Sequence, residues 1–142
     1  MLSWAAASGG PCQATKCELE GECDLDKYAP PDLIKHSPGV GKVWGYIFGC
    51  GALQTPDYNV SCVTDVGTGD RTINFTTAFS TDKYAVAASV RDSGGQALTI
   101  VGDEGADATG SVKHYIKNNG EGSHQAGANI DKKTSFVISG DQ

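Results

Sequence analysis

The stretch DYNVSCVTDVGTGDRTINFTTAF, residues 57–79, carries the clearest structural signal in the chain. Apolar residues alternate with polar ones on both sides of a glycine-rich segment, with Val60 before it and Ile73 and Phe75 after it. Alternation with a period of two is typical of a strand that buries one face. The segment 65–70 contains two glycines, which adopt the positive φ angles of tight turns at little steric cost. The stretch therefore predicts a β-hairpin.

The same alternation recurs towards the C-terminus, at 84–90, 97–101, 111–116 and 134–139. There are 19 glycines among 142 residues, and this content favours turn-rich β structure over helix. We expect an all-β fold, an antiparallel β-sandwich of seven or eight short strands, with a small barrel as the alternative.

An earlier segment, residues 43–48, places Trp44, Tyr46 and Phe48 on one face of a strand. Aromatic rings on a sheet face stack against sugars in some proteins, but they also fill the core of a sandwich or an interface between subunits. We interpret these three rings as core or interface packing.

The N-terminal residues 1–35 differ from the rest of the chain. They contain three cysteines, the acidic run ELEGECDLD and the pair Pro30-Pro31, without apolar periodicity of 2 or 3.6. Such a segment needs a cross-link, a metal or a partner surface to become ordered. We expect two parts, an irregular anchor over 1–35 and a β domain over 36–142.

Three cysteines of this anchor, Cys12, Cys17 and Cys23, leave three alternatives open. Their thiolates are zinc or iron–sulfur ligands if His36 or a neighbouring chain completes the site. In the second alternative, two of the cysteines form a disulfide within the chain and the third bridges to another chain. Free thiols are the third. Because no Cys-x-x-Cys pair is present, we expect no cofactor and treat the metal site as the weaker alternative.

Charge and hydropathy exclude several partners. The formal net charge is −6, whereas nucleic-acid binding needs a basic face. No segment approaches the roughly 20 apolar residues of a membrane span, and the N-terminus lacks the basic region of a signal peptide. We therefore expect no nucleic acid, no membrane insertion and synthesis in a cytoplasm.

Residues for catalysis are sparse. The three histidines are His36, His114 and His124, and no nucleophile elbow, phosphate-binding loop or zinc-protease motif accompanies them. We interpret His114 as a residue on a sheet face, and we expect that the protein is not an enzyme.

Five short motifs resemble a C-terminal β-sandwich (knob) domain of tailed-phage fibre and tail proteins. The resemblance covers residues 34–90 closely, and its strand layout is also similar to that of H-type lectins, which are trimeric sandwiches that bind sugars. The motifs are Lys42-Val-Trp44, Tyr58-Asn-Val-Ser61, Thr64-Asp-Val-Gly-Thr-Gly-Asp70, Asn74-Phe-Thr-Thr77 and Asp82-Lys-Tyr84.

The resemblance implies a structural protein on the outside of a virion, on the tail or the capsid, made in the host cytoplasm. The expected function is a short tail or head fibre, in which residues 1–35 dock onto other virion proteins and a homotrimeric knob attaches to a host-surface glycan or protein. A capsid decoration or cement protein and a soluble carbohydrate-binding module are the alternatives.

Two cysteines depart from the family pattern, because Cys50 and Cys62 stand where the family more often has small or polar residues. This departure suggests a disulfide between them, with two buried free thiols as the alternative.

If a glycan site exists, we expect it in the loops, since loops on a rigid sandwich carry most recognition. The long polar loop 118–129 is the first choice, and Tyr115 is a candidate for sugar stacking. The candidate ligand-binding residues are Asn118, Asn119, His124 and Asn129.

Overall fold

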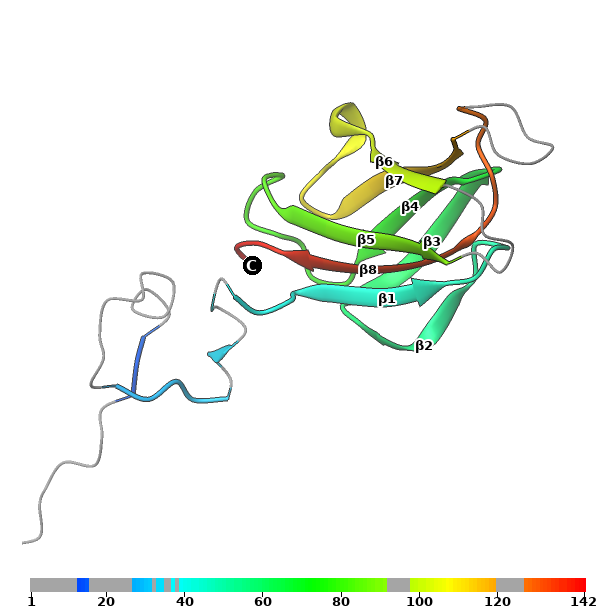
Figure 1. The fold of residues 1–142 in the computed structure, drawn as a ribbon. Coiled ribbons are helices and arrows are strands. Elements are labelled where there is room, and N and C mark those ends of the chain that lie inside the picture. The colour runs from blue at the N-terminus through cyan, green and yellow to red at the C-terminus, as the bar shows by residue number, and fades with distance from the viewer. Residues whose placement is uncertain are drawn as a thin grey trace, which may run out of the picture. The chain divides into compact units, whose positions relative to one another are not determined.

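Figure 1 shows the computed structural model of the chain. The chain divides into two compact units, Met1–Val40 and Gly41–Gln142, and all eight named strands belong to the second unit. The structure describes residues 13–15, 27–31, 33–34, 37, 39–91, 98–119 and 127–142.

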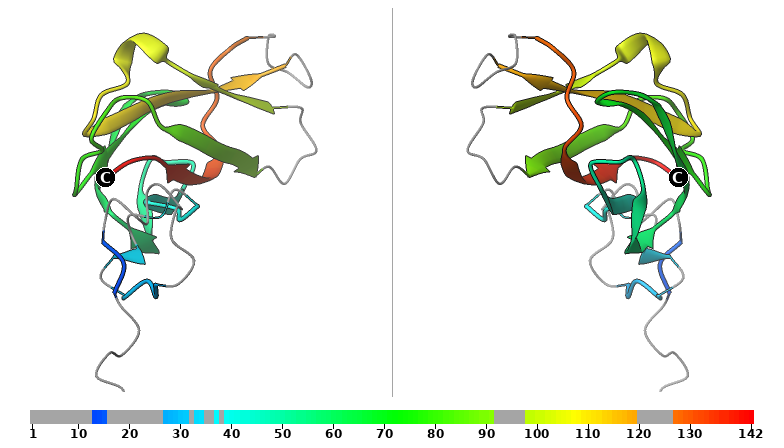
Figure 2. Two further views of the ribbon diagram at one scale, coloured as in Figure 1. Left: turned by 90° about the vertical axis from the view of Figure 1, so that its left-hand side faces the viewer. Right: turned by 90° about the vertical axis from the view of Figure 1, so that its right-hand side faces the viewer.

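Eight antiparallel strands form two four-stranded sheets, so the predicted all-β sandwich is confirmed. One sheet has the order β2-β1-β8-β5 and the other the order β3-β4-β7-β6, and Figure 2 shows the two sheets from the side. A short 3-10 turn, η2 (Glu104–Ala106), lies between β6 and β7. The strands are β1 (Val43–Ile47), β2 (Leu53–Tyr58), β3 (Val60–Gly67), β4 (Asp70–Phe75), β5 (Ala85–Arg91), β6 (Leu98–Gly102), β7 (Ser111–Asn118) and β8 (Lys133–Ser139).

The core lies between the facing sides of the two sheets. Its members come from both sheets and from the connection after β4, and each buried aliphatic or aromatic side chain contributes about 1.5–3 kcal/mol. The alternation in β4, β7 and β8 is that predicted from the sequence. The buried cluster consists of Val43, Ile47, Val60, Ile73, Phe75, Phe79, Val112, Phe136 and Ile138.

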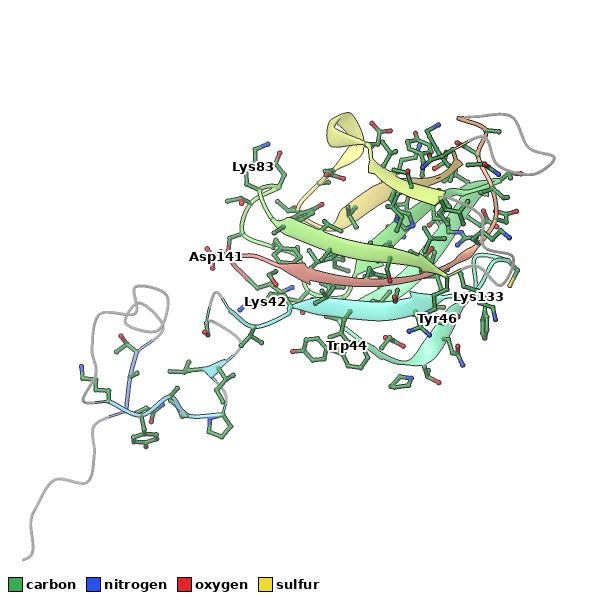
Figure 3. All side chains as sticks on the ribbon, viewed as in Figure 1. Lys42, Trp44, Tyr46, Lys83, Lys133 and Asp141 are labelled. Carbon is green, nitrogen blue, oxygen red and sulfur yellow. The ribbon has the colours of Figure 1, made fainter. Side chains whose placement is uncertain are left out.

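The interpretation of the aromatic residues of β1 as core was wrong, because the other face of the strand is buried; their packing at an interface between subunits stays a prediction. Val43 and Ile47 are fully buried, whereas Trp44 is 39% exposed, and Figure 3 shows the Trp44 side chain pointing away from the sheet. The cause lies at Gly45, where an added Cβ would stand 3.0 Å from the ring of Phe136. The glycine leaves room for that ring in the core. This contact determines that Val43, Gly45 and Ile47 are the residues of β1 that face inward.

Strand β2 was not predicted, because the hairpin predicted over residues 57–79 took Tyr58 and Val60 as parts of one strand. In the structure Asn59 separates the two strands with a φ of 58°, a left-handed conformation that asparagine tolerates better than most residues. Its side-chain Oδ1 accepts a hydrogen bond from the Thr77 backbone N–H at 2.7 Å. At this residue the chain passes from one sheet to the other.

The predicted hairpin is formed by β3 and β4. Gly67 pairs with Asp70, so Thr68 and Gly69 make the turn, and Gly69 has a φ of +62°. The Gly69 N–H donates to Oδ1 of Asp131 at 2.7 Å, and its carbonyl accepts from the Ile116 N–H at 2.8 Å. The tip of the hairpin is therefore held against β7 and the segment before β8.

A buried arginine connects the two sheets. Arg71 lies on the inner face of β4 with no exposed surface. Its guanidinium donates to the carbonyl of Lys132 at 2.9 Å and to that of Gly49 at 2.6 Å. It also lies 3.5 Å from Oδ1 of Asp131. One side chain thus holds the turn after β1 and the segment that enters β8.

Replacement of the two hairpin glycines by alanine should have very different effects. A Cβ at Gly69 would lie 2.7–2.8 Å from backbone atoms of Ile130 and Ile116, and backbone atoms cannot swing aside. We expect Gly69→Ala to lower the free energy of unfolding by about 3 kcal/mol, from steric overlap and left-handed strain together. Gly67 has no atom within 4 Å of an added Cβ, so Gly67→Ala should change it by less than about 0.5 kcal/mol. Urea denaturation measures both, and equal effects would contradict this account of the turn.

Removal of the buried guanidinium should be more costly than removal of an exposed one. Arg71→Met leaves two carbonyls without their donors, and we expect a loss of about 3–5 kcal/mol in the free energy of unfolding. Arg91→Met is the matched control, because Arg91 is exposed and its guanidinium lies over the Tyr46 ring, 5.9 Å from the ring centre. This substitution should cost about 0.5–1 kcal/mol. Comparable losses in urea denaturation would contradict the role assigned to Arg71.

Candidate functional site

The outer side of the β2-β1-β8-β5 sheet carries exposed aromatic side chains. Trp44 pairs directly with Tyr58 on β2 and with Val137 on β8, so the three side chains lie next to one another on the same face. Tyr58 is 48% exposed and Val137 is 40% exposed. We call Trp44, Tyr58 and Val137 the aromatic face, and it offers a flat apolar surface to another molecule.

The same side of β1 continues with partly covered rings. Tyr46 and Phe48 make an edge-to-face contact with ring centroids 5.7 Å apart. The guanidinium of Arg91 lies 5.9 Å from the centre of the Tyr46 ring, and the Lys133 ammonium lies 5.7 Å from that of Phe48. Cations therefore border the aromatic residues at this end of the strand.

Tyr115, the predicted sugar-stacking residue, lies on the outer side of the other sheet and is half-buried. Its hydroxyl donates to Oδ2 of Asp103 at 2.9 Å. The ammonium groups of Lys113 and Lys117 lie 5.0 and 5.4 Å from the centre of its ring. Because its ring already contacts two cations, Tyr115 is a poorer stacking platform than Trp44.

Of the predicted loop residues, the structure describes three, Asn118, Asn119 and Asn129, and Asn129 forms a β-bridge with Lys117, next to Asn118. Asn118 is fully buried at the end of β7, whereas Asn119 is exposed and exchanges hydrogen bonds with the Thr99 hydroxyl. Asn129 accepts a hydrogen bond from the Lys117 ammonium at 3.0 Å. His124 lies outside the described residues. The two asparagines that flank the undescribed part of the loop thus bind neighbouring strand residues.

The predicted disulfide is not present, because Cys50 and Cys62 are both free and exposed. An added Cβ at Gly51 would lie 2.9 Å from the carboxylate of Asp65, so the turn that carries Cys50 abuts Asp65. Cys62 lies three residues before Asp65 on β3, so Asp65, and not Cys62, is the β3 residue that faces this turn. An irregularity in register between Val60 and Cys62 accompanies the change from a buried to an exposed side chain.

The N-terminal cysteines, Cys12, Cys17 and Cys23, lie outside the described residues, as does His36. Among the residues that are described, no group of three His, Cys, Asp or Glu side chains has the arrangement of a metal site.

A cleft of about 370 Å³ opens between β5 and β6, the outermost strands of the two sheets. β5 and β6 lie next to each other in the views of Figures 1 and 2. Most of the lining is apolar, and His114 is its most buried polar side chain. The lining residues are Ile73, Tyr84, Val86, Ala88, Ile100, Gly102, Asp107, Val112, Lys113, His114 and Phe136.

His114 stands on the inner face of β7 between Val112 and Ile116, as predicted, and it is only 5% exposed. Its Nε2 has no hydrogen-bond partner in the described part of the chain. Burial lowers the pKa of His114 to about 4, and the positive charge of Arg71 adds to this effect, while Asp70 opposes it. The imidazole is therefore neutral at neutral pH.

A second titratable group of the cleft is also neutral. Burial and the nearby carboxylate of Asp107 raise the pKa of Tyr84 to about 12. Its hydroxyl donates to the carbonyl of Ser111 at 2.7 Å. The cleft therefore presents a neutral imidazole and a phenol that already has an acceptor.

The sequence analysis placed Trp44 on a strand face but missed its exposure and its neighbours Tyr58 and Val137, and it missed the cleft. The signal for the aromatic face is Gly45, since a glycine between two aliphatic residues on a strand leaves a gap that a neighbouring ring fills. The sequence feature that marks the cleft is the pair of Gly102 and His114, which lie opposite each other on β6 and β7. Local alternation does not show that these two strands pair.

Comparison with known proteins found no matching protein family, no matching curated protein and no matching solved structure. The likeness to phage fibre domains therefore rests on the sequence motifs alone. A search of the described residues for a helix with the length and apolar character of a membrane span found none.

The buried histidine should make stability depend on pH in a defined window. His114 binds a proton with a pKa of 6.5 when unfolded and of about 4 when folded, so between these values the unfolded chain binds more protons. We expect the free energy of unfolding to be highest above pH 6.5 and to fall by about 3 kcal/mol, from this residue, as the pH is lowered through 4.

The measurement is urea denaturation at a series of pH values, for the natural chain and for His114→Leu. Both chains share the effects of the carboxylates, so the difference between them isolates the imidazole. Parallel pH profiles would show that His114 is protonated equally in both states, against this prediction.

Proposed function

We propose that the chain is a structural protein of a tailed-phage virion, a short tail or head fibre whose β-sandwich projects as a knob for attachment to the host surface. Residues 1–35 dock onto other virion proteins, and the knob assembles as a homotrimer. The sequence motifs support this proposal, since they fall on consecutive parts of the sandwich: β1, the β2–β3 passage, the β3–β4 turn, β4 and the approach to β5.

The observation that carries the attachment role is the aromatic face. Trp44 and Tyr58 expose 39% and 48% of their surface and lie side by side. Large apolar side chains grouped on a protein surface mark contact sites, and tryptophan and tyrosine supply much of the binding energy where they are buried by a partner. Trp44 is also the residue that ends the first of the five motifs.

A flat face with exposed rings suits either of two partners in this role. A host-surface glycan stacks its apolar ring faces on tryptophan and tyrosine, whereas a host protein covers such rings with its own apolar side chains. The same face on a cement protein would be covered by the capsid shell, and in a soluble carbohydrate-binding module it would bind sugar without any particle.

Particles that carry Trp44→Ala together with Tyr58→Ala should adsorb to host cells at least about tenfold more slowly, because each ring is of the type that costs more than about 1.4 kcal/mol when removed from an interface. Adsorption kinetics measure the rate, and mass spectrometry of purified particles checks that the copy number is unchanged. Val66→Ala is the control, since Val66 is an exposed apolar residue of β3 on the other sheet, and it should adsorb normally.

Normal adsorption of the double variant would contradict attachment through this face. A normal rate combined with a loss of heat stability of the particle would favour the cement protein instead. Binding of a glycan by the isolated chain, with no copies found on any particle, would favour the soluble module.

A further inference from the structure

The inner face of β5 is open to solvent at one edge of the sandwich. Val86 pairs with Ile138 on β8, and both belong to the side of the sheet that faces the core. Ile138 is fully buried, but Val86 is 44% exposed, and the next inward residue, Ala88, is also exposed. Apolar inner-face residues at this edge therefore border the cleft and are not covered by the other sheet.

The opposite wall lacks a side chain at its centre. Gly102 is the last residue of β6 and pairs with His114. An added Cβ at Gly102 would meet no atom within 4 Å, so the space beside the imidazole is empty on that side. Gly102 therefore leaves the cleft open next to its pairing partner His114.

His114 supplies the polar end of this space. Its side chain is only 5% exposed, and its Nε2 has no hydrogen-bond partner in the described residues. An unpaired buried nitrogen of this kind costs free energy that a hydrogen bond recovers. A hydroxyl group satisfies the nitrogen in either tautomer of the neutral ring, because it both donates and accepts.

The other polar residues of the cleft are already engaged. The Lys113 ammonium lies 3.3 Å from Asp70 and 4.0 Å from Asp103, Asp107 accepts a hydrogen bond from the Lys113 backbone N–H at 3.3 Å, and the Tyr84 hydroxyl donates to Ser111. The one ammonium group of the described lining is therefore already paired and cannot balance an anionic ligand, and burial of an unpaired charge is costly.

We infer that the cleft between β5 and β6 is a binding site for a small uncharged molecule with a compact apolar body and one hydroxyl group, which hydrogen-bonds to Nε2 of His114. The volume of about 370 Å³ lies at the lower end of small-molecule sites, and it fits a single substituted ring. This site is independent of the aromatic face, which lies on the outer side of the sheet.

The test uses the full chain labelled with ¹⁵N, titrated with p-cresol and followed by NMR. The amide signals of Val86, Gly102 and His114 should shift together and saturate, with an affinity in the millimolar range that a ligand of this size reaches. Toluene, which lacks the hydroxyl, should bind about tenfold more weakly because it makes no hydrogen bond. The anion p-toluate should not bind.

Two variants locate the site. Gly102→Val places a branched side chain in the empty space beside His114 and should abolish binding of p-cresol and toluene alike. Gly110→Val is the matched control, because an added Cβ at Gly110 also meets no atom within 4 Å and Gly110 does not line the cleft; it should bind p-cresol normally. His114→Leu should bind p-cresol and toluene equally.

Several results would overturn the inference. These are an absence of saturable shifts at the three amides, binding of p-toluate as strong as that of p-cresol, and normal p-cresol binding by Gly102→Val. If His114→Leu does not fold, the Gly102→Val and Gly110→Val pair and the comparison of p-cresol with toluene still decide the question. None of these results bears on attachment through Trp44 and Tyr58.

Discussion

The buried guanidinium of Arg71 is the constraint on which the arrangement of the two sheets depends. A charge in a protein interior is tolerated only where hydrogen bonds replace its hydration, and the carbonyls of Gly49 and Lys132 provide them. These carbonyls belong to the turn after β1 and to the segment before β8, which are strands of the other sheet. Asp131 in turn holds the tip of the β3–β4 hairpin through Gly69. The hydrogen bonds of Arg71 and of its neighbour Asp131 therefore fix the position of three connections at the same end of the sandwich.

The sequence predicted best those strands whose two faces differ in polarity. In β4 the pair Ile73 and Phe75, and in β7 the pair Val112 and Ile116, alternate with polar or amphipathic neighbours. The buried face follows from that alternation, and His114 was placed on the correct side. In β1 both faces are apolar, and local alternation alone does not decide between the aromatic set and the aliphatic set. The decision comes from the Phe136 ring, which needs the space above Gly45, and this is a contact with a strand about ninety residues away. The short strand β2 was missed because it contains Pro56 and several polar residues, as edge strands often do.

The candidate sites were harder to predict than the strands, because both depend on which strands are neighbours. Trp44 and Tyr58 form a pair only because β1 lies beside β2, and the cleft exists only because β5 and β6 end their respective sheets. The loop residues that were chosen from composition predicted ligand-binding side chains less well than alternation predicted the strands. Asn118 proved to be the buried end of a strand, and Asn129 binds a lysine of β7. Polar composition indicates a loop, but it does not show which side chains of that loop are available to a ligand.

The inward and outward residues of β1 are subject to different constraints, although they alternate along one short strand. Packing in the core constrains Val43, Gly45 and Ile47. Because the core is close-packed, adding or removing even one methyl group there disturbs the neighbouring strands. Trp44, between Val43 and Gly45, faces outward and is exposed, so contacts outside the core constrain it. A lineage of such chains is therefore free to exchange its outward residues one at a time and meet new partners, while the inward residues of the same five-residue strand keep the fold unchanged.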